Sequence, residues 1–166
     1  MIDLFFSNPR KKNGFTIVEL IIVFSIIAIL SSIGVVASVN YSRAQSLEAA
    51  TQDLKTILNQ AKSYAQSQYK PPECNNNALE KFRLELDRSD NEYTLWVVCS
   101  GLQTIVQSQL PSDVSFDLTG TTSDYFEFPI LTGGIIADGP SPWYIRLNGA
   151  GGRYKIITLE QNGIIK

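Results

Sequence analysis

The chain has 166 residues, of which 44% are hydrophobic and 18% are charged, as expected of one compact domain with an appendage. Its formal net charge of −2 is too small to imply a nucleic-acid or acidic-substrate partner. The sequence has no histidine, the commonest general base and metal ligand, and its two cysteines are too few for a zinc site. We therefore expect no catalytic site, no metal and no cofactor.

A short basic segment precedes a long apolar run over residues 15–39. The cluster Arg10, Lys11 and Lys12 is expected to stay on the cytoplasmic side of a membrane. As a helix the run is about 37 Å long at about 1.5 Å per residue, more than the roughly 30 Å of hydrocarbon in a bilayer. A secretory signal has a shorter apolar core with its cleavage site after it, whereas here Gly14 precedes the run. The pattern predicts a membrane-spanning helix.

Glu19 is the only residue of this run that can carry a charge. Because an ionised carboxylate in hydrocarbon costs several kcal/mol, it requires a partner. If the chain is cut between Gly14 and Phe15, the new α-amino group of Phe15 lies about one helical turn from Glu19. That amine, or a cation of a neighbouring subunit, can neutralise the carboxylate. The alternative is that Glu19 lies at the membrane surface and reaches water.

The sequence Lys-Lys-Asn-Gly-Phe-Thr-Ile-Val-Glu-Leu over residues 11–20 resembles the cleavage and methylation signature of type IV prepilins and type II secretion pseudopilins. The resemblance implies that residues 1–14 are a leader, and that prepilin peptidase cuts after Gly14 and methylates the amine of Phe15. It also implies that Glu19 guides assembly. The implied partners are other pilin or pseudopilin subunits, an inner-membrane assembly platform and membrane lipid. The run lacks the helix-kinking proline of many members, and Gly34 is the nearest weak point of the helix.

Polar residues begin at Asn40, but the helical period continues. The spacing predicts an amphipathic continuation over residues 40–70, which Pro71 and Pro72 end because proline cannot continue the hydrogen-bond ladder. The opposite face of this helix is polar. The buried stripe is expected to pack on a sheet and consists of Leu47, Thr51, Leu54, Leu58, Ala61 and Ala65.

Residues 71–166 are predicted to form an extracytoplasmic β-rich domain. Alternation over residues 82–87 and a second apolar segment over residues 93–99 predict a hairpin with Glu85 and Asp87 on its solvent face. Asn162-Gly163 predicts a terminal hairpin. The predicted fold class is α+β, with a long N-terminal helix packed on an antiparallel sheet, as in pilins. Further short strands are expected at residues 104–107, 114–118, 125–128, 144–147 and 154–159.

This domain also resembles the H-type minor pseudopilins and related minor pilins. The resemblance lies in the phrase Leu-Pro-Ser-Asp-Val at residues 110–114, a Phe-rich strand ending in Pro129, and a terminal hairpin ending in Asn-Gly-Ile. It implies a structural minor subunit of a type II secretion pseudopilus or type IV pilus-like filament. Before assembly that subunit would cross the cytoplasmic membrane once, with its C-terminal domain in the periplasm. We find no equivalent of the acidic calcium-binding loop of the G-type major pseudopilin.

The sequence leaves the state of its two cysteines open. Cys74 and Cys99 can form one disulfide that closes a loop of about 25 residues and contributes about 3 kcal/mol. The alternative is a pair of buried free thiols, because sequence does not show whether the Cα atoms lie close enough.

Two alternative functions also remain open. Arg146, Arg153 and Lys155 can form a small basic cluster, which would suit a DNA-uptake minor pilin with a weak DNA-binding surface. Three charges offer few phosphate contacts, so nucleic acid is not the expected partner. The other alternative is a membrane-tethered extracytoplasmic binding domain, which would need neither Gly14 at a cleavage site nor Glu19 within the membrane.

Overall fold

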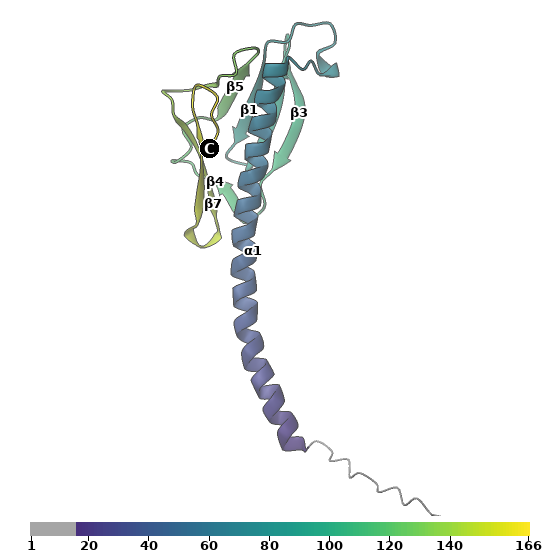
Figure 1. Cartoon of the computed structure of the whole chain (residues 1–166), viewed down its shortest axis with the longest axis vertical. Coiled ribbons are helices and arrows are strands. Elements are labelled where there is room, and N and C mark those ends of the chain that lie inside the picture. Colours follow the sequence, from purple (N-terminus) through teal and green to yellow (C-terminus); the bar gives the residue numbers. More distant parts are fainter. Residues whose placement is uncertain (1–15) are drawn as a thin grey trace, which may run out of the picture. The chain divides into compact units, whose positions relative to one another are not determined.

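The computed structural model describes residues 16–166, apart from the side chains of residues 32–37 and of residue 73. The predicted leader and the cleavage site between Gly14 and Phe15 therefore lie outside the described residues. The chain forms two compact units, with the division between Val39 and Asn40. Figure 1 labels the elements in chain order.

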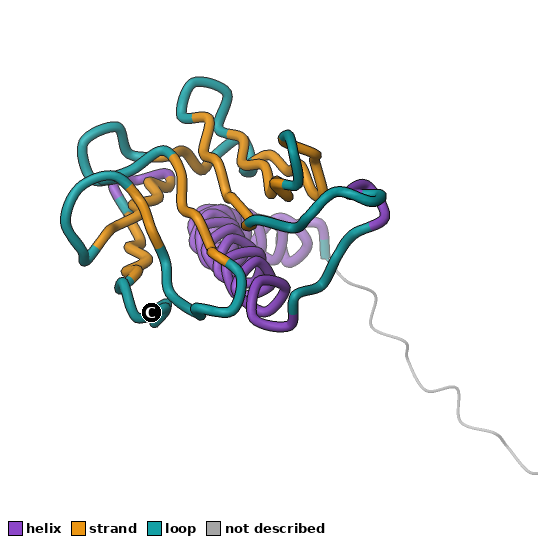
Figure 2. The backbone as a smooth tube through the Cα atoms, turned by 90° about the horizontal axis from the view of Figure 1, so that it is seen from above, coloured by secondary structure: helices purple, strands orange, loops and turns teal. Residues whose placement is uncertain are grey.

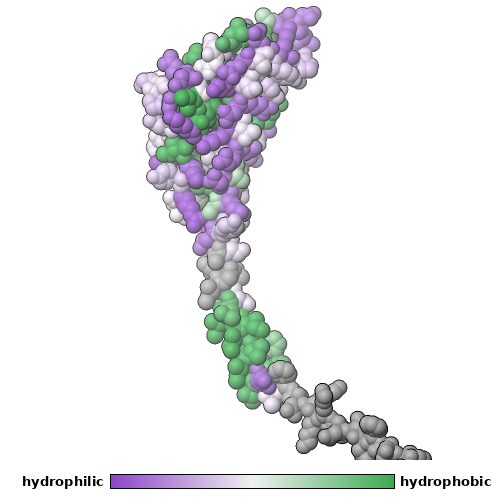
Figure 3. Space-filling model, viewed as in Figure 1, coloured by the Kyte–Doolittle hydropathy of each residue, from purple (hydrophilic) through white to green (hydrophobic). Residues whose placement is uncertain are grey.

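In the first unit the described residues form the N-terminal part of helix α1, Ile17–Ser67. Thr16 immediately precedes the helix and caps its N-terminus. Its hydroxyl accepts a hydrogen bond of 3.2 Å from the backbone N–H of Glu19. The large apolar side chains from Ile17 to Leu30 are between 45% and 79% exposed. Figure 3 shows the resulting hydrophobic surface along this segment.

No helix within the described residues is both long and apolar enough to cross a membrane. The predicted spanning segment, residues 15–39, includes residue 15 and the side chains of residues 32–37, which are outside that part of the chain. The backbone of α1 continues without a break through Gly34.

In the second unit α1 ends at Ser67, slightly before residue 70, the predicted end of the amphipathic continuation. The backbone of Gln68 turns to φ 53°, the left-handed conformation common after a helix. The N–H groups of Gln68 and Tyr69 donate to the carbonyls of Ala65 and Tyr64 and so satisfy the last turn. The helix therefore stops through its own cap, ahead of the two prolines.

The strands are antiparallel, as predicted, but they form two sheets where the predicted fold class named one. The first has the strand order β3-β2-β1-β5-β6 and the second the order β4-β7-β8. The 3₁₀ turn η1 precedes the sheets, and η2 connects β7 to β8. The bounds are η1 Pro72–Cys74, β1 Lys81–Asp87, β2 Glu92–Val98, β3 Leu102–Gln109, β4 Val114–Phe116, β5 Tyr125–Pro129, β6 Ile136–Ala137, β7 Trp143–Gly149, η2 Ala150–Gly152 and β8 Tyr154–Leu159.

The terminal hairpin differs from its prediction. Gly163 lies in a turn with φ 85°, where its N–H donates to the carbonyl of Glu160. The returning segment pairs with β8 only through a bridge between Leu159 and Ile165 and through hydrogen bonds of Lys166. The Asn-Gly turn is thus present, but the described residues after it form a single bridge and not a second strand.

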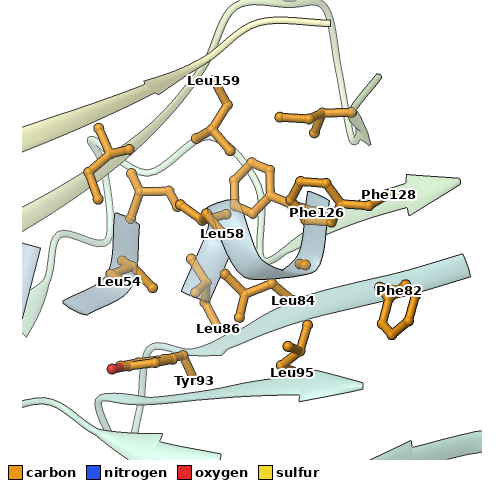
Figure 4. Packing of buried hydrophobic residues seen from close by; sticks show 14 of the residues in the cluster. Leu54, Leu58, Phe82, Leu84, Leu86, Tyr93, Leu95, Phe126, Phe128 and Leu159 are labelled. Atoms are coloured by element: carbon orange, nitrogen blue, oxygen red, sulfur yellow. The ribbon is translucent and has the colours of Figure 1, made fainter. Parts of the chain in front are cut away.

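One hydrophobic core joins α1 to the inner faces of both sheets. All six residues of the predicted stripe are at most 3% exposed, including Leu47 and Thr51. Figure 4 shows Leu58 among side chains of β1 and β5, such as Leu84 and Phe126. Figure 2, seen from above, shows the strands curving around one side of the helix. This packing of an apolar helix stripe on alternating strands confirms the predicted α+β fold.

Candidate functional site

Glu19 lies in the first turn of α1 among exposed apolar side chains. Its neighbours Val18 and Leu20 are 66% and 51% exposed. None of the ion pairs within residues 16–166 involves Glu19. A cation that neutralises its carboxylate must therefore come from residues 1–15 or from another molecule.

Cys74 and Cys99 form a disulfide, the first of the two alternatives that the sequence left open. The sulfur atoms are 2.02 Å apart and the Cα atoms 5.6 Å apart. The bridge ties the end of η1 to the residue after β2, and both cysteines are buried. It therefore fastens the segment that follows α1 to the five-stranded sheet.

Arg146, the first member of the predicted basic cluster, is occupied within the three-stranded sheet. Its Nε lies 3.3 Å from Oδ2 of Asp117, and its guanidinium lies 4.1 Å from the centre of the Tyr154 ring. A side-chain hydrogen bond from Asn148 and backbone bonds nearby, including one from Gly120, hold the pKa of Asp117 well below its usual range. Asp117 is therefore a permanent counter-ion of Arg146 at neutral pH.

The other two members of the cluster reach back to α1 by separate contacts. Lys155 Nζ lies 2.7 Å from Oε2 of Glu48, and this hydrogen bond is the main cause that lowers the pKa of Glu48. Arg153 Nη1 donates to the backbone carbonyl of Asn40 at 2.9 Å. The three cations thus lie in one region, but two of them are matched by carboxylates. Sequence spacing did not reveal those partners, because they come from distant elements.

The sequence also did not reveal an ion-pair network on the outer face of the five-stranded sheet. Glu127 accepts hydrogen bonds from Lys81 Nζ at 2.8 Å and from Arg83 Nη2 at 2.5 Å. The guanidinium of Arg83 also lies 5.0 Å from the centre of the Tyr125 ring. Burial acts to raise the pKa of Glu127, but the bonds from Lys81 and Arg83 outweigh it and lower that pKa. Strand alternation places these residues outward; only the register of β1 with β5 brings them together.

Within residues 16–166, no group of three or more Cys, Asp or Glu side chains is arranged to hold a metal ion.

The comparisons with known proteins give a motif and a fold. Residues 9–35 match the family described as "Prokaryotic N-terminal methylation motif". No curated protein matches the sequence. Among solved structures, the chain is similar to the minor pseudopilin EpsH from the Type 2 Secretion System of Vibrio cholerae, with a TM-score of 0.55 and 14% identity over 73% of this chain and 94% of that chain. A second EpsH structure gives a TM-score of 0.53 and 12% identity over 75% of this chain and 93% of that chain.

The chain thus combines a match to the N-terminal methylation motif over residues 9–35 with a fold similar to that of a solved minor pseudopilin. The similar solved structures are pseudopilins rather than enzymes.

Proposed function

We propose that the chain is a minor structural subunit of a type II secretion pseudopilus or of a related type IV pilus-like filament. The observation that carries this proposal is the presence, in one chain, of the methylation motif at residues 9–35 and of a C-terminal unit with the EpsH fold. The motif supplies a route for processing. The fold supplies a compact unit that the filament can display.

In this proposal prepilin peptidase cuts after Gly14 and methylates the amine of Phe15. The motif match spans both residues. The spacing places the new amine about one helical turn from Glu19. Processing thus creates, at the start of the mature chain, a cation suited to the carboxylate that lacks an ion pair among the described residues.

Residues 15–39 then hold the unassembled subunit in the cytoplasmic membrane, and the unit from Asn40 onward lies in the periplasm. The buried disulfide between Cys74 and Cys99 supports this placement, because disulfides form and persist in oxidising compartments such as the bacterial periplasm. The positive charges of Arg10, Lys11 and Lys12 orient the chain so that the leader lies on the cytoplasmic side of the membrane.

During assembly, at an inner-membrane platform, the apolar face of α1 leaves lipid and packs against the helices of neighbouring subunits. The exposure of the apolar side chains between Ile17 and Leu30 leaves this segment available for such packing. Glu19 pairs with the Phe15 amine of a neighbour and sets the register between subunits. A buried carboxylate without that partner would be costly, so a subunit out of register is disfavoured.

Replacing the carboxylate tests this role. In cells that make the filament, Glu19→Gln is expected to leave cleavage after Gly14 intact but to remove the subunit from the sheared filament fraction, as measured by immunoblot. Glu48→Gln, an exposed carboxylate later on the same helix, is the matched control and should assemble normally. Filaments that contain the Glu19→Gln subunit at the wild-type level would refute the assembly role.

The DNA-uptake alternative has less support from the geometry. Of the three cations predicted to contact DNA, Arg146 and Lys155 lie against Asp117 and Glu48. Arg153 alone keeps its charge without an ion pair among residues 16–166, and a single phosphate contact gives little affinity. We propose no catalytic activity for this chain.

A further inference from the structure

The connection between β7 and β8 is fastened to the start of the second unit. Its Arg153 donates a 2.9 Å hydrogen bond to the carbonyl of Asn40, the first residue after the apolar run 15–39. The connection itself is the small, uncharged turn η2, Ala150–Gly152. Figure 1 shows the β7–β8 hairpin alongside the part of α1 that belongs to the second unit. The hydrogen bond fixes Arg153 at the level of residue 40.

A second arginine lies at the same level. Arg43 follows Asn40 by three positions, which places the two residues on the same face of the helix. Both Arg43 and Arg153 are exposed, and neither has an ion pair within residues 16–166. The nearby charge of Lys155 is matched by Glu48. This end of the unit therefore carries two uncompensated positive charges.

Two tyrosines accompany the arginines. Tyr41 is 65% exposed and Tyr154 is 54% exposed, although Arg146 covers one face of the Tyr154 ring. Tyrosine and arginine are the residue types that gather at a membrane–water interface, since a ring and a charge on a flexible stem suit the headgroup layer. The two tyrosines and the two arginines are exposed, and none of them belongs to the core cluster.

The position of these residues along the chain matches the depth of a headgroup layer. A bilayer is about 40–45 Å thick with its headgroups and about 30 Å without them, which leaves roughly 5–7 Å on each side. At about 1.5 Å per residue, that layer covers about four helical residues. When the run 15–39 tilts so that its length fits the hydrocarbon, the residues that follow Val39 up to about Ala44 fall within this layer. Arg153 lies at the same depth through its bond to Asn40.

We propose that Tyr41, Arg43, Arg153 and Tyr154, here called the headgroup surface, bind anionic phospholipid headgroups while the subunit is still in the membrane. This inference rests on the proposed function, in which residues 15–39 span the bilayer. Each guanidinium presents paired N–H donors to phosphate oxygens. Bound in this way, the β7–β8 connection lies on the membrane surface until assembly withdraws the subunit from lipid.

The test uses the full-length processed protein in nanodiscs of phosphatidylcholine, with and without phosphatidylglycerol. Mass spectrometry measures the lipid retained by the protein after mild detergent extraction, and hydrogen exchange measures protection of residues 150–154. Each arginine near an anionic membrane surface strengthens binding to that surface about fivefold. Arg43→Gln with Arg153→Gln is therefore expected to lower phosphatidylglycerol enrichment at least about fivefold and to abolish the added protection.

Two further variants separate charge from structure. Arg153→Lys keeps the charge but loses the paired N–H donors, so it is expected to retain more enrichment than the single variant Arg153→Gln. Equal losses in these two variants would make Arg153 purely structural and overturn the proposal. Lys70→Gln removes an exposed cation beyond the other end of α1 and should change nothing. Equal enrichment in wild type and the double variant would also overturn the proposal.

The remaining outcomes distinguish the possible ligands and the two proposals. If the double variant loses binding to double-stranded DNA in a mobility-shift assay while its lipid enrichment is unchanged, the surface serves nucleic acid and the lipid proposal is wrong. If the wild-type chain fails to enter nanodiscs, the membrane role under the proposed function is wrong as well. If the chain enters nanodiscs but shows no preference for phosphatidylglycerol, the proposal that the headgroup surface binds anionic lipid is wrong, while the proposed membrane role stands.

Discussion

At the scale of single residues, Glu127 shows how a charge on a sheet face becomes part of the fold. Its side chain is 11% exposed, while those of its partners Lys81 and Arg83 are 29% and 28% exposed. Removing Glu127 leaves two cations that can turn toward water. We therefore expect Glu127→Gln to lower the free energy of unfolding by about 1–2 kcal/mol. This value lies between the cost of breaking a surface ion pair and that of breaking a fully buried one.

The pH dependence of stability follows from the same carboxylate. The folded-state pKa of Glu127 is lowered below its ordinary value of 4.5, so its contribution is present above that value and is lost as pH falls through the folded pKa. Glu127→Gln should lower the free energy of unfolding at neutral pH and show a smaller further loss on acidification than wild type. Urea unfolding at neutral and acidic pH measures both effects.

Glu85 offers the control for this prediction, since it is exposed on β1 and forms no ion pair within residues 16–166. Glu85→Gln should change the free energy of unfolding by less than about 0.5 kcal/mol. Equal effects of the two substitutions would mean that the network around Glu127 adds nothing beyond surface charge.

The disulfide is the second residue-scale prediction. Cys74 and Cys99 are separated by 25 residues, and closing a loop of this length in the unfolded chain contributes about 3 kcal/mol. The double variant Cys74→Ser, Cys99→Ser should therefore unfold at lower urea concentration than oxidised wild type. Wild type unfolded in the presence of a thiol reductant should match the double variant, and an unchanged midpoint in both would contradict the prediction.

At the scale of elements, the stripe on α1 carries the packing of the second unit. Leu58 is fully buried at 0% exposure between the two sheets. Leu58→Ala should cost about 2–5 kcal/mol, because it removes buried methyl groups and leaves a cavity. Ser63→Ala, on the exposed face of the same helix, is the matched control and should be nearly neutral. Thermal unfolding of both variants gives the comparison.

The sequence allowed the long elements to be predicted because each repeats a simple period over many residues. The spacing of Leu47 through Ala65 indicated a buried stripe, and the alternation around Phe82 indicated an inward-facing strand. Strand β6, Ile136–Ala137, was missed because two residues hold no period. Strand β3, Leu102–Gln109, is longer than predicted because its polar residues reflect pairing along the edge of β2 and not burial.

The candidate site was only partly readable for a related reason. Gly14, Phe15 and Glu19 form a local motif, so their spacing alone carries the prediction. The partners of Arg146 and Lys155 come from elements far away in sequence. The register that joins Arg83 to Glu127 also depends on which strand lies beside β1, a choice that tertiary packing makes.

At the scale of the whole molecule, the chain divides by chemistry as well as by structure. The described residues before Asn40 expose apolar side chains, whereas those after it bury theirs in a core sealed by a disulfide. Exposed apolar side chains are not expected in a soluble single domain, and Glu19 among them is not expected in a simple membrane tether. The proposed subunit, which passes from the membrane into a filament, accounts for both features.

The most direct test of this account is the mass of the N-terminus after co-expression with an active prepilin peptidase. The account predicts a mature chain that begins at N-methylated Phe15, and an uncleaved chain for Gly14→Leu. Peptide mass spectrometry of both proteins reads the result, with a known prepilin as the positive control. A wild-type chain that keeps residues 1–14 while the control is cleaved would contradict the account and leave a tethered extracytoplasmic domain in its place.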